Sequence, residues 1–190
     1  MQLNVRPPLE IIARLYKEED ADIFADFEQV RDCTNKAFFE NKLDPVVFSF
    51  TRNPRSKCAF LPDRYASLEG KVRHGFALNS NHCKLVGDEG SMLLIASLLV
   101  QQARRDLGPE GRNGTRGTPG NIDSWSHKVL VGIGIETFVP DGDEDRQLGY
   151  GLSYNLVEGG PFDLMCRSLM ISGFRFRWHE NAPNFDTESN

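Results

Sequence analysis

Several features that define whole classes of proteins are missing from this 190-residue sequence. The longest mainly apolar run covers only residues 92–100. A helix that crosses a bilayer needs about 20 such residues, so we expect no membrane association. The first ten residues contain no apolar stretch, which predicts no signal peptide. We therefore expect a cytoplasmic protein.

The four cysteines form no Cys-x-x-Cys pair, which excludes a zinc ribbon. They are Cys33, Cys58, Cys83 and Cys166. In a reducing cytoplasm we expect them to be free thiols. The sequence also has no Gly-Lys-Ser/Thr phosphate loop and no glycine-rich dinucleotide loop.

Positive charge is in the minority, with 22 Lys and Arg against 27 Asp and Glu and a net charge of −5. This balance excludes a protein that coats nucleic acid by bulk charge, although it allows a local basic patch. No repeat or low-complexity linker divides the chain. We expect a single domain over residues 1–180 and a frayed tail over 181–190.

The residues that are present predict helices in four stretches. Apolar side chains recur at three- and four-residue steps between residues 8 and 41, which predicts an N-terminal helical part. Asp88 is suited to cap the apolar helix that runs to residue 107. Shorter helices are expected over 122–131 and after Pro161.

Strand patterns lie between these helices. Alternating apolar residues predict short strands over 46–51, 58–61, 72–79 and 152–157. Near the C-terminus, Phe174, Phe176 and Trp178 alternate with polar residues, which predicts a terminal strand. Helices segregated from a small mixed sheet make the expected fold class α+β.

Five short segments carry a family resemblance. They are TNKAFFENKL at 34–43, CAF at 58–60, GFALN at 75–79, NIDSW at 121–125 and YNLVEGGPF at 154–162. In this order they resemble segments of SprT-like metalloprotease domains, above all the short phage- and plasmid-type members. The resemblance covers about residues 20–180. It implies a zincin-like fold in which a small mixed sheet packs against an N-terminal helix, a central active-site helix and a following helix.

The catalytic residues of that family are not reproduced here. Its central helix carries His-Glu-x-x-His, which supplies two zinc ligands and the general base, and a third His comes from the next helix. The matching positions are Gln101, Gln102, Arg105 and Asn121. Amides are poor zinc ligands, Gln102 cannot take up a proton near neutral pH, and Arg105 is permanently cationic. The resemblance therefore implies a pseudoprotease without metal or other cofactor.

Six arginines are candidate binding residues: Arg104, Arg105, Arg112, Arg116, Arg175 and Arg177. The first two end the central helix, the next two lie in a predicted flexible Gly/Arg loop over 108–120, and the last two share one face of the terminal strand. Together they could bind phosphate or an acidic partner. The alternatives are a local ion pair with Asp106 or Glu110, a solvated connector, and a charged edge that prevents sheet association.

Three functional hypotheses follow. The first is a catalytically inactive SprT-like module that binds an unidentified protein partner through its former substrate cleft and the arginine-bearing loop. The second is a DNA-associated protein that contacts nucleic acid through the local arginines, because the resemblance implies work near DNA. The third is a phage- or plasmid-encoded inhibitor of a host defence complex. A hydrolase with other residues lacks a visible nucleophile–base pair.

Overall fold

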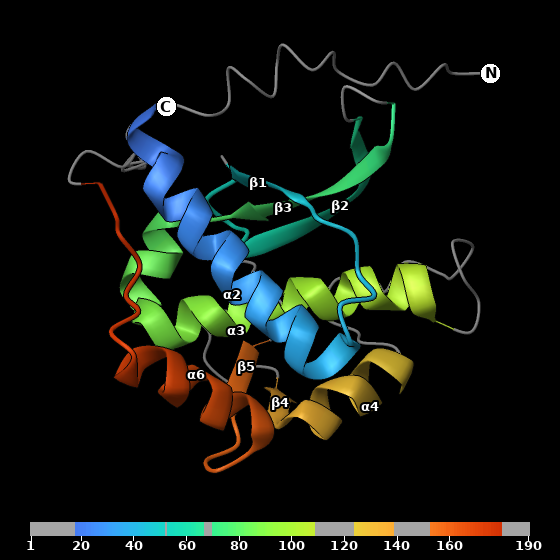
Figure 1. Cartoon of the computed structure of the whole chain (residues 1–190), viewed down its shortest axis with the longest axis vertical. Coiled ribbons are helices and arrows are strands. Elements are labelled where there is room, and N and C mark those ends of the chain that lie inside the picture. The colour runs from blue at the N-terminus through green and yellow to red at the C-terminus, as the bar shows by residue number, and fades with distance from the viewer. Residues whose placement is uncertain (1–17, 52, 67–69, 109–123, 139–152, 180–190) are drawn as a thin grey trace.

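The structure is a computed structural model that describes residues 18–51, 53–66, 70–108, 124–138 and 153–179 (Figure 1). Its elements in chain order are η1 (Glu18–Asp20), α2 (Ala21–Phe39), β1 (Val47–Phe50), β2 (Cys58–Ala66), β3 (Val72–Leu78), α3 (Ser80–Leu107), α4 (Ser124–Ile133), β4 (Ile135–Phe138), β5 (Ser153–Leu156) and α6 (Pro161–Ile171). Helices that pack around small, separate sheets confirm the α+β class.

The main sheet has three strands in the order β1-β3-β2. β1 runs parallel to β3 and β2 runs antiparallel to it, so the sheet is mixed, as predicted. β2 is longer than expected and its register shifts between Leu61 and Tyr65. At this bulge Pro62 cannot donate to the ladder, and Asp63 has a positive φ of 49°. A second, two-stranded sheet joins β4 to β5.

The core lies between the inner face of the main sheet and helices α2 and α3. Phe48 and Phe76 project from the sheet, and their rings meet edge-to-face at a centroid distance of 5.6 Å. Phe27 on α2 is fully buried against them, and residues 92–100 of α3 supply a continuous buried stretch. A nine-residue apolar run in a helix is buried all round, which explains why α3 crosses the middle of the molecule (Figure 1).

Most helix predictions are confirmed, with shifted bounds. α2 lies within the predicted stretch 8–41, whereas residues 1–17 are outside the described part. α3 begins nine residues earlier than predicted, at Ser80, and continues across a kink at Gly87, whose φ is 72°. The Asn79 side-chain oxygen accepts a hydrogen bond from the His82 backbone N–H at 3.1 Å and caps this helix. The predicted loop over 108–120 lies outside the described residues.

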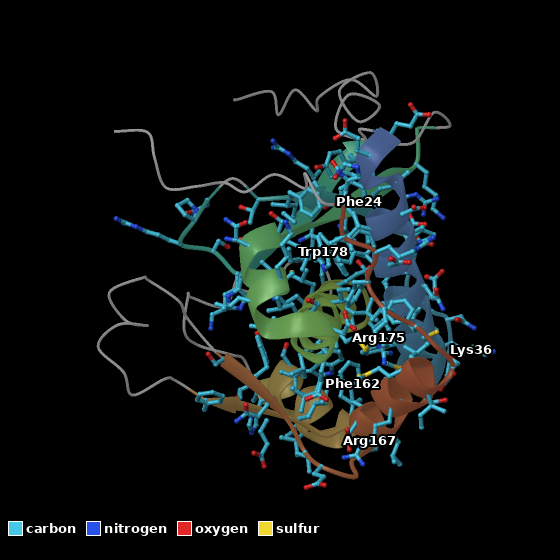
Figure 2. All side chains as sticks on the ribbon, turned by 90° about the vertical axis from the view of Figure 1, so that its left-hand side faces the viewer. Phe24, Lys36, Phe162, Arg167, Arg175 and Trp178 are labelled. Atoms are coloured by element: carbon cyan, nitrogen blue, oxygen red, sulfur yellow. The ribbon has the colours of Figure 1, made fainter. Side chains whose placement is uncertain are left out.

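The terminal strand predicted around Phe174, Phe176 and Trp178 is wrong. Residues 174–179, here called the C-terminal segment, pair with no described strand. The Phe176 backbone N–H instead donates to the Asp88 carboxylate at 3.4 Å, and the next N–H donates to Asp26 at 2.8 Å. Asp88, which the sequence predicted as the cap of α3, thus lies inside this helix and binds the C-terminal segment, whereas the cap is Asn79. Alternation sets which side chains face the core (Figure 2), but it does not determine what satisfies the backbone.

Candidate functional site

The positions that match the SprT-like active site lie on the C-terminal half of α3, beside β2 and β3. Gln101 is exposed, Gln102 is completely buried, and Arg105 is half-buried. Asn121 lies outside the described residues. Gln102 and Arg105 therefore both contact other parts of the fold, whereas the Gln101 side chain is exposed to solvent.

Gln102 links α3 to the turn that follows α2. Its Nε2 donates to the Asp44 carbonyl oxygen at 2.9 Å and lies 3.4 Å from Asp106 Oδ2. The same Asp44 carbonyl also accepts a hydrogen bond from Arg31 Nη2. The Gln102 amide thus holds two parts of the fold together.

Arg105 links α3 to the edge strand. Its guanidinium forms an ion pair with Asp63 on the bulge of β2, and each side chain is only a quarter exposed. The Asp63 backbone N–H donates to His74 Nδ1 on β3 at 2.8 Å. Because Nδ1 accepts this bond, the ring proton of neutral His74 is on Nε2, which donates to Asp106 Oδ1 at 3.1 Å.

We call Asp63, His74, Gln102, Arg105 and Asp106 the polar cluster. Both ring nitrogens of His74 are used inside it, so this histidine offers no free nitrogen for a proton transfer. The sequence did not reveal the cluster, because its members come from β2, β3 and α3. The only signal was that Pro62 interrupts an apolar pattern just before Asp63.

The polar cluster predicts a specific acid sensitivity at Asp106. Burial alone would raise the pKa of Asp106, but hydrogen bonds from His74 and Gln102 and the positive charge of Arg105 outweigh it and lower the pKa below 3.8. A lowered pKa means that ionised Asp106 stabilises the fold above about pH 4, and that this contribution disappears as the pH falls through the folded-state pKa. We expect Asp106→Asn to be less stable than the wild type near neutral pH.

The difference between the two proteins should then shrink below about pH 4. Urea denaturation at several pH values between neutral and about pH 2.5 measures it. A stability difference that stays constant over this range would contradict the lowered pKa of Asp106.

Two of the candidate arginines hold the C-terminal segment in place. Arg177 donates from Nε and Nη2 to Asp26 Oδ1 at 3.0 and 2.8 Å and lies 3.4 Å from Asp22. Arg175 lies 3.7 Å from the Asp88 carboxylate. These guanidinium groups therefore join the segment to α2 and α3.

Within the described part of the chain, the remaining candidate arginines do not form one shared surface. Arg104 lies half-buried on α3, and Arg105 belongs to the polar cluster. Arg112 and Arg116 lie outside the described residues. A shared basic surface formed by all six arginines stays a prediction.

Comparisons of the chain with protein-family models, with curated proteins and with solved structures found no match. The resemblance to SprT-like domains therefore stays a prediction that rests on the five segments. In the described part of the chain, no group of three His, Cys, Asp or Glu side chains could hold a metal ion. Among the described helices, none has the length and apolar character needed to cross a membrane.

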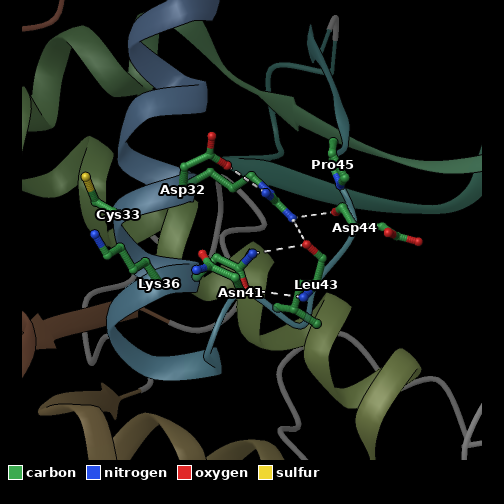
Figure 3. A pocket seen from close by; sticks show the side chains of 9 residues that line it. Asp32, Cys33, Lys36, Asn41, Leu43, Asp44 and Pro45 are labelled. Carbon is green, nitrogen blue, oxygen red and sulfur yellow. Dashed lines mark hydrogen bonds and ion pairs between the residues drawn. The ribbon is translucent and has the colours of Figure 1, made fainter.

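An open hollow of about 450 Å³ lies between α2 and residues 41–45 (Figure 3). Arg31 is buried at its wall and donates to the Leu43 carbonyl at 2.8 Å, while Asn35 exchanges two hydrogen bonds with the Leu43 backbone. Burial and the nearby Asp32 raise the pKa of the Cys33 thiol on the same wall. The hollow thus contains no activated nucleophile, and its most buried polar groups serve to hold the turn.

All four cysteines are free thiols, as expected. Burial raises the pKa of Cys58 to about 11 and the pKa values of Cys83 and Cys166 to about 12. Thiols with such values are protonated near neutral pH and are poor nucleophiles. These side chains belong to the packing of the fold.

Proposed function

We propose that this protein is a non-catalytic, SprT-like pseudoprotease that binds a protein partner. The binding region is the edge of β2 together with the C-terminal half of α3, where the resemblance places a substrate cleft. The protein acts by holding its partner and performs no hydrolysis.

The observation that carries this proposal is the internal use of the former catalytic positions. Gln102 is fully buried, and its amide donates to Asp44 and Asp106, so the general-base position has no basic group. Arg105 is paired with Asp63, so a cation stands at a position that would otherwise bind zinc. Neither side chain can therefore supply the base or the zinc ligand that the family's positions provide.

The position of β2 supports the binding part of the proposal. β2 pairs with β3 on one side, and no other described strand pairs with it. An edge strand leaves backbone N–H and C=O groups that an extended segment of another protein can complete. This mode of binding needs no catalytic group.

The test is a metal and activity measurement on the purified full chain. We expect zinc well below one equivalent after dialysis, and no cleavage of casein in the presence or absence of a chelator. The comparison protein carries Gln101→His, Gln102→Glu, Arg105→His and Asn121→His, which rebuilds the family motif and should take up about one zinc ion.

Circular dichroism is needed as a control, because the comparison protein loses the Arg105–Asp63 pair and the Gln102 amide donor. If it fails to fold, the wild-type measurements decide the question alone. One tightly bound zinc per wild-type chain, together with chelator-sensitive cleavage, would overturn the proposal.

A further inference from the structure

Among the described residues, three arginines have a guanidinium group with no interaction partner. Arginines with an ion-paired carboxylate are Arg31, Arg105, Arg167, Arg175 and Arg177. For Arg55, Arg64 and Arg73, no ion pair or hydrogen bond of the guanidinium is found within the described ranges. All three belong to β2, β3 or the turn before β2.

These arginines lie at the two ends of β2. Arg55 is exposed in the turn that precedes the strand, and Arg64 is exposed just after the bulge. Arg73 lies on β3 directly opposite Tyr65, and its Nη1 is buried without a hydrogen-bond partner. The Arg73 guanidinium has no ion-pair partner among the described residues, so a carboxylate placed beside its accessible nitrogens would gain a charge-assisted hydrogen bond.

The charge distribution makes the region of β2 and β3 electropositive. Residues 51–78 contain six basic and two acidic residues, a formal charge of +4. Residues 18–44, which include α2, contain three basic and nine acidic residues, a formal charge of −6. A short acidic ligand at the sheet is therefore attracted, whereas a long polyanion that extends past α2 is repelled.

The outer edge of β2, with which no other described strand pairs, indicates which kind of acidic ligand fits. An extended peptide can continue the ladder with its own backbone N–H and C=O groups, and a nucleic acid strand cannot. Arg55 and Arg64 are nine positions apart, so an extended segment of up to about ten residues would span the distance between them. Arg73 lies one strand further in, about 5 Å from the edge strand.

We propose that the β2 edge binds an extended acidic segment of a partner protein. The segment pairs with the β2 backbone and places carboxylates at Arg55 at one end and, at the other end, at Arg64 on one face of the sheet and at Arg73 on the opposite face, which Arg73 shares with its partner Tyr65. The inference rests on the proposed function, because it names the chemistry of the partner at the same site.

The experiment is a titration of the isotope-labelled full chain, followed by amide NMR, with a peptide of about ten residues in which pairs of Glu alternate with pairs of Thr, so that an extended peptide presents carboxylates on both faces. We expect shift changes at the amides of β2 and the preceding turn, and none along α2. A peptide with Gln in place of each Glu should bind at least about tenfold more weakly.

A matched pair of variants tests the arginines. The variant Arg55→Gln/Arg64→Gln/Arg73→Gln should weaken binding of the acidic peptide by about tenfold or more. The control variant Lys36→Gln/Lys42→Gln/Lys128→Gln removes the same charge from exposed positions elsewhere and should bind as the wild type does. Equal losses in the two variants would show only a net-charge effect and would overturn the inference.

Two further outcomes would overturn it. One is an absence of shift changes with the acidic peptide at millimolar concentration. The other is tighter, arginine-dependent binding of an oligothymidine of about 12 nucleotides, which would assign the surface to nucleic acid. The two proposals can fail separately. If the protein is zinc-free and inactive but does not bind the acidic peptide, only this inference is rejected. If it cleaves substrate in a zinc-dependent way and still binds the acidic peptide, only the pseudoprotease proposal is rejected.

Discussion

Replacing Phe27 by alanine is expected to lower the free energy of unfolding by about 3–5 kcal/mol. The Phe27 ring is fully buried, and its centroid lies 5.5 Å from those of Phe48 and Phe176 and 5.7 Å from that of Trp178. This one side chain therefore joins α2 to the sheet and to the C-terminal segment. Its truncation removes apolar burial and leaves a cavity between three parts of the fold that cannot all move inward.

Urea denaturation of the full chain measures this loss. Phe138→Ala is the matched control, because Phe138 is 42% exposed on β4 and its truncation should change stability by less than about 0.5 kcal/mol. Similar losses in the two variants would contradict the placement of Phe27 at the centre of the core.

Replacing Asp26 by alanine is expected to cost about 2–3 kcal/mol. Its buried carboxylate accepts from the Arg177 backbone N–H at 2.8 Å and from the Arg177 guanidinium at 2.8 and 3.0 Å. The variant leaves this backbone donor without its partner. The remaining cation is more than half exposed and reaches water, which keeps the cost below that of an isolated buried charge.

Asp22→Ala is the control for the loss of stability expected in Asp26→Ala. Asp22 contacts the same guanidinium at 3.4 Å, but its side chain is 71% exposed, so its removal should cost close to zero. Hydrogen exchange at the Arg177 amide gives a local readout, because only Asp26→Ala should accelerate it. Unchanged exchange in that variant would contradict the attachment of the C-terminal segment to α2.

Local patterns in the sequence predicted several elements correctly. The helical steps of α2 and α3 and the alternation in β1 and β3 depend on which face of an element is apolar, and the sequence shows this directly. Pro161 after two glycines predicted the start of α6, since proline is preorganised for the first helical turn. β4 was missed because its four residues follow α4 almost directly and show no separate pattern.

The candidate site could be predicted only in part. The residue types at Gln101, Gln102 and Arg105 can be read from the chain, and with them the lack of a base and of zinc-binding imidazoles at those positions. Their actual contacts depend on Asp63 on β2 and Asp44 after α2. No spacing rule connects α3 to these positions.

By itself, the sequence determined the fold class, the main helices, most of the core and the types of side chain available at the candidate site. These follow from periodicity, which is a property of neighbouring residues. Only the tertiary structure decided which charges meet: it joined Arg177 to Asp26, and within the described part of the chain it gave the guanidinium groups of Arg55, Arg64 and Arg73 no acidic partner. The physical reason is that an ion pair requires proximity in space, and residues 151 positions apart approach each other only when the whole chain has packed.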